Sequence, residues 1–218
     1  MQPSTGPDPI STSGGTAHAG AGVGQRAVLV RHGETEWSRT GQHTGRADIP
    51  LTPRGEAQAR HAGLNLRGWR FAAVRVSPLG RARRTCELAG LAQGAVTDPL
   101  LQEWDYGAYE GLTAEEIRVE RPGWSIWRDG VVGGETVDDV ARRARAVIAE
   151  VRKVQGDVAL FAHGHLLRIL AACWCDLPVG AAAHLELAAG AVSLLGWERE
   201  TPTISRWNDT SHLLPPPG

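Results

Sequence analysis

Residues 27–37 read AVLVRHGETEW. Four small or apolar residues, which are typical of a buried strand, run directly into an arginine, a histidine and a glycine. A cation and an imidazole are costly to bury, so their position at the end of an apolar strand needs a reason. Parallel-sheet proteins hold ligands in the crevice beyond the carboxyl ends of their strands. We therefore expect Arg31 and His32 to lie at such an edge.

The rest of the chain alternates short apolar runs with helical patterns. Thr52 as an N-cap and Pro53 at the first helical position predict the start of a helix. Strands are expected at 71–78, 95–104 and 157–164, helices at 51–68, 81–91, 136–156 and 165–174, and a hairpin at 184–198. This alternation predicts an α/β fold of three layers, α/β/α, in which helices cover both faces of a mostly parallel central sheet.

Length and composition fit one domain. The chain has 218 residues and a net charge of −1, which gives no reason to expect nucleic acid or a membrane surface as a partner. It has no long apolar run and no signal-peptide pattern, and its three cysteines do not resemble a secreted disulfide framework, so we expect a cytoplasmic protein. We expect a disordered segment at 1–25, a domain at 26–210 and a tail at 211–218.

Four strand ends bring chemically active side chains to one edge of the sheet. The first strand leads to Arg31 and His32, the second to Arg81, the third to Glu103 and the fourth to His163. The planar donors of arginine match phosphate oxygens, and a neutral imidazole is a competent nucleophile toward phosphorus. A glutamate can protonate a leaving oxygen and then activate a water. This set predicts a phosphoryl-transfer site with a phosphohistidine.

Further residues near these strand ends are expected to bind the substrate. Glycines beside both histidines would let a phosphate approach the backbone closely, and helix N-termini would add N–H donors. Arg46, Arg121 and Arg128 lie in neighbouring loops, where they would recognise a second phosphate or a carboxylate. The expected substrate-binding residues are Gly33, Ser38, Thr44, Gly45, Tyr106, Gly164 and His165.

Four ordered motifs resemble the histidine phosphatase superfamily, in its phosphoglycerate mutase-like branch. They are LVRHGETEW at 29–37, SPLGRARRT at 77–85, LQEWDYGAYEG at 101–111 and FAHGHLLR at 161–168. The resemblance implies that His32 carries a transient phosphate, that Arg31, Arg81 and His163 surround it, and that Glu103 is the acid. It is strongest to broad acid phosphatases and sedoheptulose-bisphosphatase-like enzymes. It allows a homo-oligomer. We expect no cofactor, and no metal either, because two converging arginines would repel a divalent cation.

Two departures from the mutase pattern bear on the reaction. Ser38 stands where mutases often have asparagine, and the segment from Glu103 to Glu135 is shorter than in cofactor-dependent mutases. A shorter segment retains a bisphosphate less well and favours hydrolysis. The expected enzyme is a metal-independent phosphatase of small phosphomonoesters, such as phosphorylated sugars or glycerates. Its optimum should be acidic to neutral, because a protonated Glu103 and a cationic His163 both favour low pH.

Three alternatives stay open at this point. The first is a metal site built from the HGH motif at 163–165 with His32 and Glu103, although converging arginines would repel a divalent cation. The second is a cofactor-dependent phosphoglycerate mutase, which would move phosphate without releasing it. The third is a phosphate- or peptide-binding module without catalysis, which would be expected to have lost the nucleophile, the arginines or the acid.

Overall fold

A computed structural model describes residues 25–213. Its centre is a six-stranded sheet in the order β3-β2-β4-β1-β5-β6. The first four strands are mutually parallel, whereas β5 is antiparallel to β1 and β6 to β5. The strands are β1 (Ala27–Arg31), β2 (Phe71–Val76), β3 (Val96–Thr97), β4 (Asp157–Ala162), β5 (Val192–Glu198) and β6 (Thr201–Asp209). The mostly parallel sheet agrees with the prediction.

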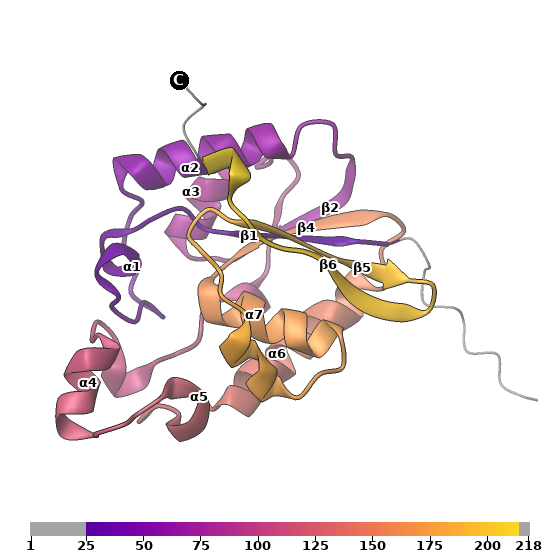
Figure 1. Cartoon of the computed structure of the whole chain (residues 1–218). Coiled ribbons are helices and arrows are strands. Elements are labelled where there is room, and N and C mark those ends of the chain that lie inside the picture. The colour runs from indigo at the N-terminus through magenta and orange to yellow at the C-terminus, as the bar shows by residue number, and fades with distance from the viewer. Residues whose placement is uncertain (1–24, 214–218) are drawn as a thin grey trace, which may run out of the picture.

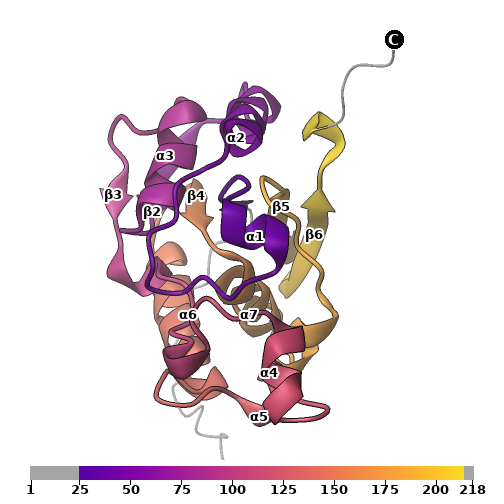
Figure 2. The ribbon, with the colours of Figure 1, turned by 90° about the vertical axis from the view of Figure 1, so that its left-hand side faces the viewer.

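Helices cover both faces of the sheet, which completes the expected α/β/α arrangement (Figure 1). One face carries α2 (Pro53–Asn65) and α3 (Gly80–Leu88), and the other carries α6 (Val137–Val151) and α7 (Gly164–Trp174). Three short helices, α1 (Glu36–Thr40), α4 (Ala114–Glu120) and α5 (Ile126–Asp129), lie at the edge where the parallel strands end (Figure 2). None of the helices in the described part of the chain is long and apolar enough to cross a membrane.

Strand β1 is held from both sides. Ala27 and Leu29 pack into the core under α6 and α7, whereas Val28 and Val30 pack into the core under α2 and α3. This alternation is the two-residue period of a strand that is buried on both faces. Each buried valine or leucine contributes about 1.5–3 kcal/mol of transfer free energy. The position of Arg31 and the residue after it is therefore set by a packed strand.

Two long helices form as their sequence patterns predict. Thr52 accepts a hydrogen bond from the N–H of Gly55 at 3.0 Å and so caps α2, with Pro53 in the first position. In α6 the apolar face predicted from the helical spacing is buried against the sheet, with Val140 and Val147 fully covered. Capping and spacing therefore predict both helices from the local sequence, and packing in the folded chain stabilises them.

The hairpin expected at 184–198 is wrong in position. Its second half forms β5, but the partner of β5 is β6, which follows it in the chain. Residues 185–191 form a loop, and the carbonyl oxygens of Leu187 and Ala191 in this loop accept hydrogen bonds from Arg31. The apolar residues of this segment are buried by loop packing on the core rather than in a strand. The extended segment expected at 95–104 is also shorter than predicted. Only β3 forms there, because a 3₁₀ turn (Pro99–Leu101) follows it.

The folded chain extends beyond the expected domain at both ends. Gln25, which was expected to be disordered, is buried, and its amide donates to the carbonyl oxygens of Val151 and Val154. The first residues of the expected tail form a 3₁₀ turn (Ser211–Leu213), in which His212 donates to the carbonyl oxygen of Gly190 at 3.0 Å. The rest of the expected disordered segment, 1–24, and of the tail, 214–218, lies outside the described residues.

Candidate active site

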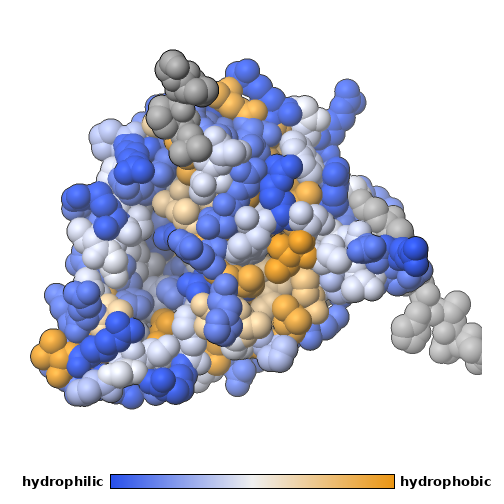
Figure 3. Space-filling model, in the orientation of Figure 1, coloured by the Kyte–Doolittle hydropathy of each residue, from blue (hydrophilic) through white to orange (hydrophobic). Residues whose placement is uncertain are grey.

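A pocket of about 170 Å³ opens at the carboxyl ends of β1 and β4. The space-filling view shows a hollow at this edge, bordered mainly by hydrophilic residues (Figure 3). Its size suits a small polar metabolite. The residues that line it are Arg31, His32, Ser38, Gly41, Gln42, His43, Thr44, Glu103, Tyr106, Gly164, His165, Arg168 and Leu187. The structure therefore brings Arg31, His32 and Glu103 to one pocket, as the sequence predicts.

His32 lines this pocket with only 4% of its surface exposed. Its Nδ1 lies 2.8 Å from the carbonyl oxygen of Gly33, so Nδ1 carries the proton and, in the neutral ring, Nε2 keeps its lone pair. Burial, followed by the positive charges of Arg81 and Arg31, lowers the pKa of His32 well below its ordinary value of 6.5. His32 is therefore a neutral imidazole with a nitrogen free for nucleophilic attack.

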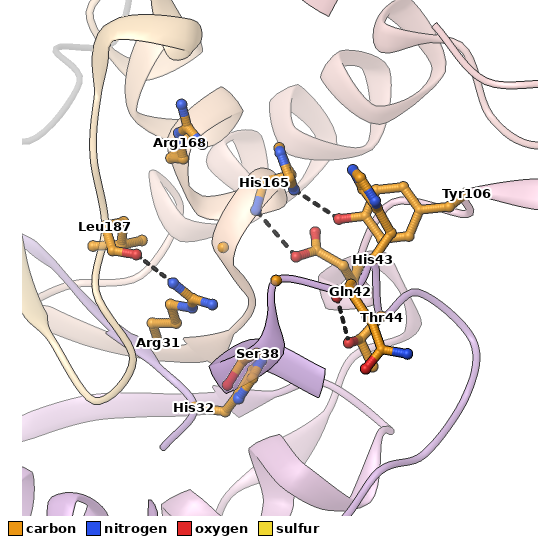
Figure 4. A pocket seen from close by; sticks show the side chains of 13 residues that line it. Arg31, His32, Ser38, Gln42, His43, Thr44, Tyr106, His165, Arg168 and Leu187 are labelled. Atoms are coloured by element: carbon orange, nitrogen blue, oxygen red, sulfur yellow. Dashed lines mark hydrogen bonds between the residues drawn. The ribbon is translucent and has the colours of Figure 1, made fainter. Parts of the chain in front are cut away.

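Arg31 has no ionic partner among residues 25–213. Its Nη1 donates to the carbonyl oxygen of Leu187 (Figure 4). The guanidinium also lies beside Gly164, where an added Cβ would be 3.4 Å from it. Its buried Nε has no hydrogen-bond partner within residues 25–213. Burial lowers the pKa of Arg31 somewhat, but arginine stays charged at any useful pH. The side chain thus offers an unused donor and a full positive charge to an anion.

Arg81 lies in the wall behind the pocket and not among the residues that line it. It is 1% exposed, and its Nη atoms donate to the carbonyl oxygens of Ala47 at 2.7 Å and of Thr44 and Gly45 at 3.0 Å. Its Nε donates to Nδ1 of His163 at 3.2 Å. Arg81 therefore fixes the loop around Thr44, and its positive charge acts on His32 from behind the pocket.

His163 is neutral in this structure, which corrects the expectation of a cation. Its Nδ1 accepts the hydrogen bond from Arg81, and its Nε2 lies 2.7 Å from the hydroxyl of Ser77. Burial, followed by the charge of Arg81, lowers the pKa of His163 well below 6.5. Its ring centre lies 5.1 Å from that of His32. Because both nitrogens are engaged, His163 has no free lone pair for a metal ion.

Glu103 lies at the N-terminus of α7 and is 5% exposed. Its Oε1 accepts hydrogen bonds from the N–H groups of Trp104 at 3.0 Å and Leu166 at 2.9 Å, and its Oε2 accepts one from His165 at 3.0 Å. The positive end of the helix dipole also faces this carboxylate. Since Oε2 has only one such partner, it keeps a lone pair for a proton beside the pocket. Glu103 is thus held rigidly and can exchange a proton there.

One tyrosine and two further imidazoles form another wall of the pocket. The hydroxyl of Tyr106 lies 2.7 Å from Nδ1 of His165 (Figure 4). His43 meets Tyr106 edge to face and stacks on His165, at ring-centre distances of 4.9 and 6.3 Å. Burial, followed by the charge of Glu103, raises the pKa of Tyr106 well above its ordinary value, so its hydroxyl is protonated. Both residues predicted to bind substrate here, Tyr106 and His165, line the pocket.

The chain matches a family model described as histidine phosphatase superfamily (branch 1) over residues 27–210. The chain belongs to the histidine phosphatase superfamily. An acid phosphatase of Mycobacterium tuberculosis is 37% identical to it over 194 residues, which cover 87% of this chain and 95% of the relative. A sedoheptulose 1,7-bisphosphatase of Saccharomyces cerevisiae is 39% identical over 187 residues, which cover 71% of this chain and 69% of the relative.

The solved structure of an open reading frame from Mycobacterium tuberculosis has the same fold. It is similar to this chain with a TM-score of 0.80 and 35% identity, and the match covers 84% of this chain and 97% of that one. The family resemblance, which rests on the four motifs, and the fold class, which rests on the alternation of strands and helices, are therefore confirmed.

The remaining residues predicted to bind substrate in this histidine phosphatase differ in position. Ser38 and Thr44 line the pocket, but the hydroxyl of Ser38 donates to the carbonyl oxygen of Thr35 at 3.0 Å and accepts from its N–H at 2.9 Å, as part of a helix cap. Gly45 does not line the pocket, and its N–H donates to Glu110 at 2.8 Å. Ser38 therefore reaches a phosphate only by leaving its cap.

Gly33 does not line the pocket either, although we expected it beside the phosphate. A Cβ at Gly33 would lie 2.2 Å from the carbonyl oxygen of Gly55, and its N–H donates to Thr85 at 3.1 Å. The missing side chain lets the end of β1 close onto α2. Gly164, in contrast, lines the pocket as expected. Only one of the two glycines beside the histidines thus leaves room for a ligand.

Gln42 and His43 line the pocket, as expected for the start of a substrate-binding loop at 42–46, but three other lining residues were not expected near the substrate: Gly41, Arg168 and Leu187. Arg168 follows Gly164 by four residues on α7, and this helical spacing could have identified it, because positions i and i+4 share a helix face. Leu187 carried no such signal, since it acts through its carbonyl oxygen in the loop that we expected to be a strand.

The three loop arginines expected to recognise a second anion do not line the pocket. Arg46 pairs with Asp105 at 3.2 Å and Arg128 with Asp129 at 2.9 Å. Arg121 donates to the hydroxyl of a tyrosine, Tyr109, at 2.7 Å. These interactions satisfy the loop arginines outside the site.

Proposed function

We propose that this chain is a phosphatase that hydrolyses small phosphomonoesters through a phosphohistidine at His32. The observation that carries the proposal is the tautomer of His32, whose Nδ1 is held by the carbonyl oxygen of Gly33 while Nε2 keeps its lone pair. Arg31, whose Nε has no hydrogen-bond partner in the described part of the chain, lines the same pocket as the buried carboxylate of Glu103. Two relatives that are named as phosphatases support hydrolysis as the outcome.

In the first step, Nε2 of His32 attacks the phosphorus, and the bond from phosphorus to the ester oxygen breaks. Arg31 donates from its free Nε to the phosphoryl oxygens, and Arg81 adds positive charge from behind. Oε2 of Glu103 gives its proton to the leaving oxygen, so that the alcohol departs neutral. Such positioned proton transfer contributes about 10²–10⁴-fold in rate.

In the second step, a water takes the place of the alcohol. The carboxylate of Glu103 removes a proton from this water as its oxygen attacks the phosphorus. The bond from phosphorus to Nε2 breaks, and the neutral ring of His32 is restored. Inorganic phosphate leaves, and Glu103 has regained the proton that it gave away. Neither step assigns a chemical role to a metal.

The pKa of His32 also supports an acidic to neutral optimum, although for a different reason than the sequence indicated. Because this pKa lies well below 6.5, the nucleophile stays neutral in mildly acidic solution. A protonated Glu103 is still required for the first step. An optimum above about pH 9 would contradict this assignment, given the reference pKa values of glutamate and histidine.

We also propose a cytoplasmic setting. Cys86, Cys173 and Cys175 are all free thiols, as is usual in a reducing compartment. The expected partner is a small phosphorylated metabolite rather than a macromolecule. The homo-oligomer that the family allows stays a prediction, which light scattering on the purified protein would test.

The experiment that tests the function measures phosphate release from sugar monophosphates, sugar bisphosphates and 3-phosphoglycerate. The wild type should release phosphate, and His32→Ala should reduce release to background. His61→Ala is the matched control, because His61 lies on α2 and does not line the pocket. It should keep the wild-type rate.

Two results would contradict hydrolysis. If 3-phosphoglycerate were isomerised in the presence of a bisphosphoglycerate primer and no phosphate appeared, the chain would be a mutase. If neither release nor isomerisation occurred, a binding module would be favoured.

A further inference from the structure

We propose that Arg168 binds a second anionic group, a phosphate or a carboxylate, on the alcohol part of the substrate. This would make phosphomonoesters that carry such a group the preferred substrates. The inference rests on the proposed function, because it assigns a substrate class to the same pocket.

The position of Arg168 separates it from the reacting phosphate. Arg168 lies on α7, and it lines the pocket together with Gly164 and His165 of the same helix face. Figure 4 shows Arg168 at one end of the pocket and His32 at the other, with Arg31 near His32. A phosphoryl group bound by His32 and Arg31 would leave Arg168 facing the rest of the substrate.

Contacts outside the pocket hold the guanidinium of Arg168 in place. Its Nε donates to the carbonyl oxygen of Ala182 and its Nη2 to that of Ala183, each at 3.0 Å. Its central carbon lies 4.6 Å from the ring centre of Trp127, a cation–π contact. Within residues 25–213, Nη1 has no hydrogen-bond partner. The group is thus fixed before binding, which lowers the entropy lost when an anion is bound.

The charge of Arg168 also favours an anionic ligand. Arg168 is half-buried and forms no ion pair with any carboxylate in the described part of the chain, whereas Arg46 and Arg128 each have one. Glu103 and Glu186 act on it only from beyond ion-pair distance. A phosphate at His32 would be balanced by Arg31 and Arg81, and the charge of Arg168 would remain. A partly buried cation without a partner is stabilised when a ligand supplies the anion.

The test compares three esters that share the reacting phosphate. They are glycerol 2-phosphate, which has a neutral alcohol, 3-phosphoglycerate, which adds a carboxylate, and a hexose 1,6-bisphosphate, which adds a phosphate. The variants are Arg168→Gln, which removes the charge, and Arg168→Lys, which keeps it. The control is Arg128→Gln, because Arg128 is exposed and does not line the pocket.

For Arg168→Gln we expect kcat/KM for at least one of the anionic esters to fall at least about tenfold further than for glycerol 2-phosphate, mainly through KM. Arg168→Lys should restore most of this selectivity, and Arg128→Gln should keep the wild-type ratios. A selective loss for 3-phosphoglycerate alone assigns a carboxylate, and one for the bisphosphate alone assigns a phosphate. An equal loss for all three esters, or no loss, would overturn the inference.

A failure of the proposed function would be visible separately, as a wild type that releases phosphate from none of the three esters. In that case the affinity for the three compounds tests the role of Arg168. Calorimetric titrations of the same three compounds onto His32→Ala and onto His32→Ala with Arg168→Gln measure affinity without turnover. Weaker binding of the anionic compounds alone in the double variant would support the assignment, and unchanged affinities would overturn it.

Discussion

Single hydrogen bonds decide what each side chain in the pocket is able to do. The bond from His32 to the carbonyl oxygen of Gly33 leaves one ring nitrogen free to attack. The bonds on both nitrogens of His163 make that ring a support for Arg81 and for Ser77. Two histidines that look equivalent as residue types therefore have different roles, nucleophile and support.

At the residue scale we predict that Glu103→Gln slows both the transfer of phosphate to His32 and the hydrolysis of the phosphohistidine, and that the leaving group decides which of the two limits the rate. With glycerol 2-phosphate the rate should fall about 10²–10⁴-fold, because the leaving oxygen needs a proton. With p-nitrophenyl phosphate, whose leaving group needs none, a burst of p-nitrophenol should precede slow turnover, since water is no longer activated. Stopped-flow absorbance measures the burst. Glu115→Gln on the exposed side of α4 is the control, and a Glu103→Gln enzyme as fast as wild type on glycerol 2-phosphate would refute the role.

The identities of the reacting residues could be predicted from the sequence, but their hydrogen-bond states could not. Arg31, His32 and Glu103 end strands or follow turns whose local patterns are clear. The neutrality of His163 depends on Arg81, which is distant in sequence. Arg168 was missed because the helix that carries it is mostly apolar, and such a pattern indicates a helix in the core. Only the structure shows that one face of this helix lines the pocket.

At the scale of elements, the close approach of β1 and α2 positions the nucleophile. A Cβ at Gly33 would meet the carbonyl oxygen of Gly55 at 2.2 Å, and one at Gly55 would meet that of Glu34 at 2.1 Å. Neither contact is possible in a folded protein without movement of backbone. The two glycines therefore set the distance between the strand end and the helix.

We predict that Gly33→Ala lowers the free energy of unfolding by about 1–3 kcal/mol, as expected for overpacking. Phosphate release should fall as well, because His32 follows the displaced strand. Urea denaturation and initial rates measure the two effects. Gly180→Ala is the control, since a Cβ at Gly180 would meet nothing within 4 Å. Equal stability of the two variants would show that the contact has no energetic weight.

Among the elements, those with local signals were the ones predicted. Helices α2 and α6 have threonine caps, α6 also has a regular apolar face, and β1 and β4 have continuous apolar runs. The hairpin of β5 and β6 was misplaced, because the sequence of β6 is mostly polar and its pairing with β5 depends on the sheet already being formed.

At the scale of the whole molecule, the fold holds three neutral imidazoles in one region: His32 and His163, which are buried, and His165, which is half-buried. Burial is the largest cause that lowers the pKa of each well below 6.5. In the unfolded chain the same rings titrate near 6.5. As the pH falls below that value, the unfolded chain binds protons that the folded chain does not. Their contribution to stability is therefore complete above about pH 6.5 and is lost as the pH falls.

We predict that the free energy of unfolding decreases between about pH 7.5 and 5.5, by up to about 1.4 kcal/mol per pH unit for each histidine below 6.5. Urea denaturation at several pH values measures this slope. The lowered carboxylate pKa values, such as that of Asp139 at about 2, do not contribute in this range. His32→Asn removes one of these rings, so the slope should fall by the contribution of one proton, up to about 1.4 kcal/mol per pH unit. A free energy that does not change over this range would contradict the account.

The most direct test of the account is to trap the phosphorylated enzyme during turnover. The wild type is mixed with a substrate that carries a radiolabelled phosphate, quenched within one turnover and digested for peptide mass spectrometry. We predict an acid-labile, base-stable phosphate on His32, which accumulates further in Glu103→Gln. Steady release of phosphate without a phosphorylated enzyme, or with the label on another residue, would contradict it.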